Sequence, residues 1–377
     1  MGDLFSYLTQ QLPRAIEFLE KMVALESPSF DKPLVDEFVR FVGAQFAAMG
    51  GQVEFAHADK FGDHMIARFT GSSSERILLL GHTDTVWPAG EITKRPFKIT
   101  GGRAFGPGVF DMKAGILLIA MAIDALQKVD RGLPKCVTVL LVSDEEVGST
   151  SSRTVTESEA RPCRAVFVLE PSLPGGALKT ARKGIGRFAL KAIGRAAHAG
   201  IDPQNGVNAI EEISQQILKL QKMTDPVRGT TVTVGVVQGG TRPNVVPAEA
   251  AAEIDIRISS MEEAERMTKM IKALSPQLPG ARLEIRGSIN RPPMERTAET
   301  IRLFQLAQKV AQTLGIALKE GSTGGASDGN FTSALGIPTL DGLGAVGGGA
   351  HAVDEWVDIQ SLPHRAALLA GLLSERL

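Results

Sequence analysis

The sequence has little cysteine, almost no net charge and no long apolar run, and each absence excludes a class of protein. Its two cysteines, Cys136 and Cys163, do not make a disulfide framework, and both border apolar runs where a buried thiol is expected. The 41 basic and 42 acidic residues leave a net charge of -1, which gives no electrostatic reason to bind nucleic acid or an anionic membrane.

Membrane insertion and secretion are also not indicated. The most apolar uncharged run, Ala114 to Ile123, is much shorter than the roughly 18 residues that a membrane-spanning helix needs. The N-terminus lacks the basic and then apolar pattern of a secretory signal. We therefore expect a cytoplasmic protein without a membrane partner, and the 377 residues predict about two domains.

Apolar patterning divides the chain into an α/β part and an inserted part. Short continuous apolar strands separated by a buried helix are typical of a doubly wound, mainly parallel sheet. From Gly184 the order changes to β-α-β-β-α-β with alternating strands, which is the ferredoxin-like pattern. We therefore predict a catalytic domain in two parts, 1–183 and 293–377, interrupted by a ferredoxin-like α+β domain at 184–292. The predicted elements of the first part are helices at 3–26, 32–49 and 112–128, strands at 52–56, 64–69, 77–80, 137–142 and 165–169, and a loop at 87–108.

Potential metal ligands follow three of the predicted parallel strands. They are His82, the pair Glu145-Glu146, and Glu170, and Asp111 precedes the buried helix at the same edge of the sheet. Any one of them is best explained as a capping or turn residue. Together, without interleaved basic residues, they would repel one another unless a metal is bound. His82-x-Asp84 also suits a metal ligand, because Asp84 can accept a hydrogen bond from one ring nitrogen and leave the other free.

A second histidine completes the predicted site. His351 follows a glycine run that lets the backbone approach a site closely, whereas His57, His64 and His364 are interpreted as surface residues. Two histidines and several carboxylates suit zinc, and a bridging Asp111 would hold two ions about 3.5–4 Å apart. Of the adjacent Glu145 and Glu146, one can serve as a ligand and the other as the base. Amide hydrolysis fits this arrangement.

Several motifs resemble those of the zinc-dependent amidohydrolase superfamily, which includes glutamate carboxypeptidase, acetylornithine deacetylase, succinyl-diaminopimelate desuccinylase and aminoacylase. The motifs are Gly81-His-Thr-Asp-Thr-Val86, Gly106-x-Gly-x-x-Asp-Met-Lys113, Asp144-Glu-Glu146, Glu170-Pro171 and the late His351. The resemblance implies two zinc ions per subunit, with cobalt or manganese as substitutes, bridged by Asp111. It implies that His82 and Glu170 complete one shell and Glu146 and His351 the other. Glu145 would then be the general base, and Asp84 would orient His82.

The resemblance also extends to the inserted domain, which would be a lid and the interface of a homodimer. His198, in Ala197-His-Ala-Gly200, would reach the partner's active site and stabilise the oxyanion. Asn244 and Arg257 would bind the free carboxylate of the substrate, because a guanidinium pairs with a planar carboxylate in bidentate fashion. Lid closure would bring these residues onto the substrate. The segment Thr323–Phe331, which supplies Gly325 as a further substrate-binding residue, is similar to the glutamate carboxypeptidase branch.

The predicted function is release of a C-terminal amino acid, such as glutamate, from a small peptide or N-acyl amino acid with a free carboxylate. Met112 departs from that branch and leaves the metal site standing, and Ala114 stands where a glycine is common, with little expected effect on the chemistry. The alternative function is that of an N-acyl amino acid deacylase. Gly325-Ala-Ser-Asp-Gly329 also satisfies the nucleophile-elbow pattern of a serine hydrolase using Ser327, but a polar stretch precedes it where an apolar strand is needed. A binding protein that only retains the fold would lack a ligand or the base, and neither is missing.

Overall fold

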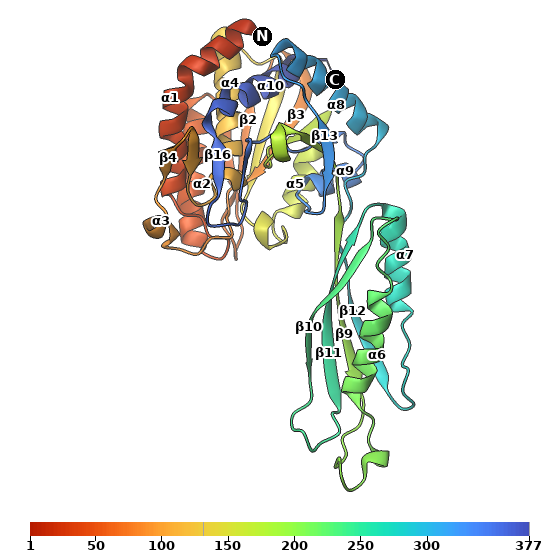
Figure 1. The fold of residues 1–377 in the computed structure, drawn as a ribbon. Helices are drawn as coiled ribbons and strands as arrows, with labels where there is room; N and C mark the ends of the chain where they lie inside the picture. Colours follow the sequence, from red (N-terminus) through yellow and green to blue (C-terminus); the bar gives the residue numbers. More distant parts are fainter. Residues whose placement is uncertain (131, 377) are drawn as a thin grey trace. The chain divides into compact units, whose positions relative to one another are not determined.

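The computed structural model describes residues 1–130 and 132–376, which form two compact units (Figure 1). Unit 1 comprises Met1–Ala181, Arg296–Ser322 and Ser327–Leu377, and unit 2 comprises Arg182–Glu295 and Thr323–Ala326. The long segment of unit 2, Arg182–Glu295, begins and ends at one place, since Arg182 N donates to Met294 O at 2.9 Å and Met294 N donates back to Arg182 O at 3.1 Å. Unit 2 is therefore an insertion into unit 1.

Unit 1 is built on a six-stranded, mainly parallel sheet. Its strand order is β1-β2-β6-β3-β7-β14. Strand β3 pairs in parallel with β6 and β7, and β14 pairs in parallel with β7. Strand β2 pairs antiparallel with both β1 and β6. This confirms the predicted α/β fold class. The strands are β1 Gln52–Ala56, β2 His64–Phe69, β3 Ser73–His82, β6 Lys135–Val142, β7 Ala165–Val168 and β14 Thr339–Leu340.

Helices cover both faces of this sheet because its central strands are apolar on both sides. In β3, Ile77 and Leu79 belong to the large core with five helices, and Leu78 and Leu80 belong to a smaller core with α5. The five helices are α1 Gly2–Ala24, α2 Lys32–Ala48, α4 Ala114–Val129, α8 Ala298–Thr313 and α10 Leu362–Ser374; on the other face lies α5 Arg153–Ala160, which packs against α9 Gly329–Ala334. Within the described residues, no helix is both long and apolar enough to span a bilayer.

The segment predicted as a loop, 87–108, contains a short helix and two short strands. Helix α3 is Glu91–Lys94, and strands β4 Lys98–Thr100 and β5 Arg103–Phe105 form a hairpin whose turn uses Gly101 and Gly102 with positive φ. The loop prediction was wrong there because β5 pairs with β16, about 250 residues later, and three-residue strands carry no periodicity. The remaining short strands are β15 Gly347–Gly348, β16 Trp356–Asp358, β8 Leu178–Arg182 and β13 Glu320–Thr323.

Unit 2 has its own sheet and its own core. Its elements are β9 Gly184–Ile193, α6 Ala209–Gln221, β10 Thr231–Gly239, β11 Glu249–Ile258, α7 Met261–Lys272 and β12 Arg282–Arg291. The antiparallel order β10-β11-β9-β12 is that of a ferredoxin-like sheet. Burial alternates along β11, where Ile254, Ile256 and Ile258 pack against the helices and the residues between them are more exposed. Both helices begin at side-chain caps, Asn208 for α6 and Ser260 for α7.

Candidate metal centre

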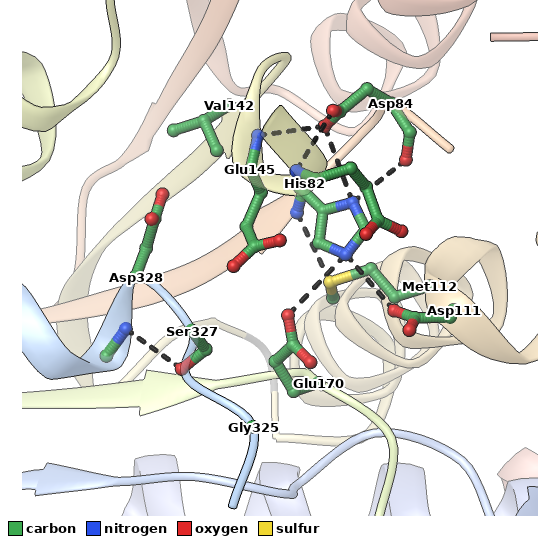
Figure 2. A network of polar contacts seen from close by, with 12 residues as sticks. His82, Asp84, Asp111, Met112, Val142, Glu145, Glu170, Gly325, Ser327 and Asp328 are labelled. Atoms are coloured by element: carbon green, nitrogen blue, oxygen red, sulfur yellow. Dashed lines mark hydrogen bonds and ion pairs between the residues drawn. The ribbon is translucent and has the colours of Figure 1, made fainter. Parts of the chain in front are cut away.

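The parallel strands of unit 1 bring the predicted ligands to one edge of the sheet. In the register of the sheet His82 lies opposite Val142, and Leu80 lies opposite Val168. The chain therefore leaves β3, β6 and β7 at the same level, and Glu145, Glu146 and Glu170 follow within four residues of the last two strands. Figure 2 shows the side chains of His82, Glu145 and Glu170 turned towards one another.

Asp111 lies between the two predicted histidine ligands. It belongs to the turn η1, Val109–Lys113, directly before α4. Its Oδ1 is 3.1 Å from Nε2 of His82, and its Oδ2 is 3.4 Å from Nε2 of His351. Each carboxylate oxygen thus faces a different histidine, which is the arrangement of a carboxylate that bridges two cations.

The other two acids divide between the same histidines. Glu170 Oε1 is 3.5 Å from His82 Nε2, and both Glu146 oxygens are 3.2 Å from His351 Nε2. Ligand atoms of His82, Asp111 and Glu146 lie within 4.8 Å of one another, as do those of His82, Glu145 and Glu170. Imidazole and carboxylate donors at such spacings fit zinc or a similar borderline divalent ion.

The ionisation of these groups reflects a concentrated negative charge. Hydrogen bonds to Asp111 and Glu146 raise the pKa of His351 to about 10. Burial by itself would lower the pKa of His82, but hydrogen bonds to Asp111 and Asp84 and the charge of Glu170 raise it well above its usual value. Burial by itself would raise the pKa of Asp111, but hydrogen bonds to His351 and His82 and their charges outweigh it, so the pKa lies below its usual value. Protons on the histidines therefore balance the carboxylates, and a metal would take their place.

Asp84 accepts hydrogen bonds from four neighbouring residues. His82 Nδ1 is 2.9 Å from the backbone carbonyl of Asp84, and the carboxylate oxygen Oδ1 is farther away, at 3.5 Å. Both Asp84 oxygens thus lie on the Nδ1 side of the ring, and the role of Asp84 in orienting His82 stays a prediction. The carboxylate also accepts from Ser29 Oγ at 2.8 Å and from the backbone N–H groups of Glu145 and Glu146, both at 3.2 Å. Asp84 therefore ties the acidic pair to the strand that carries His82.

His351 follows β15 in a loop with left-handed backbone. Its φ is 62°, a region that residues other than glycine, asparagine and aspartate rarely adopt, and its side chain is about half exposed. Gly349, two residues earlier, has φ 75° and lies against the backbone of Glu355. The glycines predicted to allow close approach thus place the imidazole beside Asp111 and Glu146.

Sequence reasoning missed Glu355, which is 1% exposed and holds the loop of Asp111. Its Oε1 accepts from the N–H groups of Phe110 at 2.8 Å and Asp111 at 2.9 Å. Its Oε2 accepts from Gly108 N at 2.9 Å and from the indole of Trp87 at 3.1 Å. Burial raises the pKa of Glu355, and the three backbone hydrogen bonds oppose that shift. The only signal in the sequence was an acid four residues after His351, which does not follow an apolar strand.

His64 differs in its surroundings from what the sequence suggested, and the surroundings of Ser327 bear on the serine-hydrolase alternative. His64, interpreted as a surface residue, is 1% exposed because it begins β2, which lies between β1 and β6. Its Nδ1 accepts from Ser143 N at 3.2 Å, and burial lowers its pKa. Ser327 is fully buried, and its hydroxyl donates to Asp341 at 2.6 Å. That hydrogen bond does not activate a nucleophile, so the geometry gives no support to a serine hydrolase.

The predicted substrate-binding residues lie in unit 2, where they are described by themselves. His198 Nδ1 accepts from the N–H groups of Gly200 and Ile201, both at 3.2 Å, so the neutral ring carries its proton on Nε2. Arg257 pairs with Asp255 through Nε at 2.7 Å and Nη2 at 3.2 Å. Asn244 is exposed. Gly325 is also exposed, and its carbonyl accepts from Arg182 at 3.2 Å.

Comparison with known proteins places this geometry in context. A model of peptidase family M20/M25/M40 matches residues 78–375. Carboxypeptidase G2 of Pseudomonas sp. (strain RS-16) is 29% identical, with 99% of this chain and 91% of that protein covered. An acetylornithine deacetylase of Erwinia tasmaniensis is 28% identical over 81% of this chain and 83% of that protein.

Solved structures share the fold. The aminopeptidase PepT of Bacillus cereus superposes with a TM-score of 0.82 at 20% identity, with 96% of this chain and 98% of that chain covered. The Bacillus subtilis YxeP protein, described as a dinuclear metal binding peptidase, superposes with a TM-score of 0.72 at 18% identity, covering 97% and 98% of the two chains.

Proposed function

The chain belongs to peptidase family M20/M25/M40 and is therefore a metal-dependent peptidase or amidohydrolase, and from this premise we propose that it binds two zinc ions and releases a C-terminal amino acid, such as glutamate, from a small substrate with a free carboxylate. The observation that supports two ions most directly is Asp111, whose two oxygens face different histidines. His82 and Glu170 would hold one ion, and Glu146 and His351 the other. Cobalt or manganese would substitute for zinc.

The chemistry requires a base beside the ligands. Bound divalent ions at such a site lower the pKa of a water molecule and polarise a carbonyl. Glu145 takes the proton of the attacking water and delivers it to the amide nitrogen as the C–N bond breaks, leaving a carboxylate and an amine. The backbone of Glu145 is held by Asp84, which supports a fixed position for this carboxylate.

Unit 2 would supply the contacts to the rest of the substrate. The Nε2–H of His198 is a hydrogen-bond donor suited to a developing oxyanion, because Nδ1 is already occupied. Arg257 would bind the free carboxylate with the guanidinium edge that Asp255 does not use, and Asn244 and the backbone of Gly325 would complete that contact. These four roles are derived from the resemblance and are tested by substitution.

A deacylase that removes the acyl group of an N-acyl amino acid is the second candidate. The similarity to acetylornithine deacetylase and to succinyl-diaminopimelate desuccinylase, the latter 26% identical, favours it. Both candidates are tested by amino-acid release from dipeptides and N-acyl amino acids carrying glutamate, aspartate, ornithine or aliphatic residues. We expect release that a chelator abolishes and zinc or cobalt restores. Release that ignores the chelator and stops with a serine-directed inhibitor would contradict the proposal.

We also propose a homodimer formed through unit 2, in which His198 serves the partner's site. Mixing Glu145→Ala subunits with His198→Ala subunits then regenerates one complete site in each mixed dimer. Since about half of the dimers are mixed after random exchange, about a quarter of wild-type activity is expected. A cis role gives no recovery, and a monomeric active enzyme would exclude the arrangement. The cytoplasmic location expected from the sequence stays a prediction.

A further inference from the structure

A cavity of 460 Å³ lies within unit 1, directly beside the candidate metal centre. Glu146, one of the proposed ligands, forms part of its wall. The rest of the wall comes from Val147 and from two loops, one before α2 and one after β3. Its size is in the range of pockets that bind small organic ligands. The cavity therefore has the place and the volume of a substrate subsite.

The wall of this cavity is mainly apolar and has no positive charge. Its lining within the described chain comes from residues 28–31, 85–89 and 146–147, which include no lysine, arginine or histidine. Two acids are present, and both have other partners. Asp31 caps α2 by accepting from Leu34 N at 3.3 Å, and Glu146 lies against His351 at 3.2 Å.

Two aromatic side chains differ in how firmly they are held. Trp87 is fixed, because its indole N–H donates to Glu355 at 3.1 Å and the guanidinium of Arg95 stacks 3.9 Å from the ring centroid. Phe30 is 80% exposed, although its ring lies 6.2 Å from that of Phe61. Because Phe30 is so exposed, its ring gains the free energy of hydrophobic burial only when a ligand covers it.

We propose that this cavity is the subsite for the acyl side of the scissile amide and that it selects an uncharged, apolar acyl group, with Phe30 as a specificity-determining residue. The inference rests on the proposed hydrolysis and adds the substrate class. The amino-acid side of the substrate carries a carboxylate, which two acids and no cation would repel. The same argument disfavours a succinyl group. A substrate ammonium group is also disfavoured, because both acids in the wall, Asp31 and Glu146, already have other partners.

The test compares three substrates that share one leaving amino acid: N-acetyl-, N-benzoyl- and N-succinyl-L-glutamate. We expect kcat/KM to be about tenfold or more higher for benzoyl than for acetyl, because a buried ring gains free energy that a methyl group does not, and to be lowest for succinyl. Phe30→Ala lowers kcat/KM for the benzoyl substrate about threefold to tenfold and leaves that for the acetyl substrate unchanged. Phe30→Leu restores part of the loss.

Two further variants sharpen the comparison. Phe55 is the matched control: it is an aromatic residue 44% exposed on β1 and absent from the cavity wall, so Phe55→Ala keeps the benzoyl preference. Phe30→Arg introduces a cation and raises the succinyl-to-benzoyl ratio of kcat/KM. Equal use of all three substrates, or a benzoyl preference that survives Phe30→Ala, overturns the subsite and leaves the proposed hydrolysis standing.

Binding is measured separately from turnover. The chain has two tryptophans, so Trp356→Phe leaves Trp87 as the only indole, and Glu145→Gln prevents hydrolysis. We expect N-(4-nitrobenzoyl)-L-glutamate to quench Trp87 fluorescence in a saturable way, with weaker binding after Phe30→Ala. Saturable quenching without hydrolysis of any substrate by the wild type would support the subsite and refute the proposed function. No quenching would refute the subsite.

Discussion

Removal of the Glu355 carboxylate is expected to loosen the metal centre without touching a ligand. In Glu355→Ala the N–H groups of Gly108, Phe110 and Asp111 lose their acceptor in a buried place. Each unsatisfied buried group costs about 1–3 kcal/mol, and water entering the vacated volume recovers part of this, so we expect a loss of about 3 kcal/mol in the free energy of unfolding. For a unit of this size that corresponds to a Tm about 6–12 °C lower.

The same change is expected to weaken zinc binding by about tenfold to a hundredfold, the usual effect of removing a group that orients a metal ligand. The physical reason is that the backbone of Asp111, whose oxygens face both histidines, is held by Glu355 Oε1 at 2.9 Å. Glu355→Gln keeps one acceptor oxygen, but its NH2 group replaces the second oxygen and faces the N–H donors that the second oxygen accepted from. We therefore expect its loss of stability and of zinc affinity to lie between those of the wild type and Glu355→Ala.

Zinc affinity is measured by competition with a chromophoric chelator, and Tm by calorimetry with and without metal. Asp354→Ala is the matched control, because Asp354 is an exposed acid next in sequence. If Glu355→Ala lowered Tm while zinc affinity stayed at the wild-type value, Glu355 would stabilise the fold alone. If neither quantity changed, the reasoning from the four hydrogen bonds would be refuted.

Four other outcomes are expected. Glu145→Ala lowers kcat by at least about a hundredfold with both metals still bound, because proton transfer loses its base; near-normal turnover by metal-loaded protein would exclude that role. His351→Asn, which suits a left-handed backbone, lowers the zinc content measured by elemental analysis from two ions towards one. In the metal-free protein the pKa of His351 is raised to about 10. The stabilisation by its positive charge is therefore complete below pH about 6.5 and is lost as the pH rises towards 10. The Tm difference between metal-free wild type and metal-free His351→Asn is expected to shrink over that pH range. Phe167→Ala, in the middle of β7 and fully buried, costs about 3–5 kcal/mol in denaturant titration.

Much of the site could be predicted because it depends on strand direction. Continuous apolar runs identified the parallel strands, and parallel strands necessarily end at one edge, so His82, Glu145, Glu146 and Glu170 could be expected together. Asp111 and His351 were placed by the glycine-containing motifs around them. Those signals are local in the sequence, and the structure brings all six side chains together.

The rest depended on contacts between distant segments. Strands β5 and β16 exist because they pair with each other across about 250 residues, and neither carries a pattern of its own. Glu355 gains its role from a loop far earlier in the chain, which no local rule indicates. His64 is buried because β2 is an interior strand, and a strand of six residues does not reveal its neighbours.

The paired hydrogen bonds between Arg182 and Met294 have a consequence for how the molecule can diversify. Because the two ends of the segment Arg182–Glu295 meet there, this segment can be exchanged as a cassette, or replaced by a tight turn, without stretching unit 1. All five proposed ligands and the proposed base lie outside the cassette, and the cassette has a core of its own. Sequence change within the insertion can therefore leave the five proposed ligands and the proposed base in place.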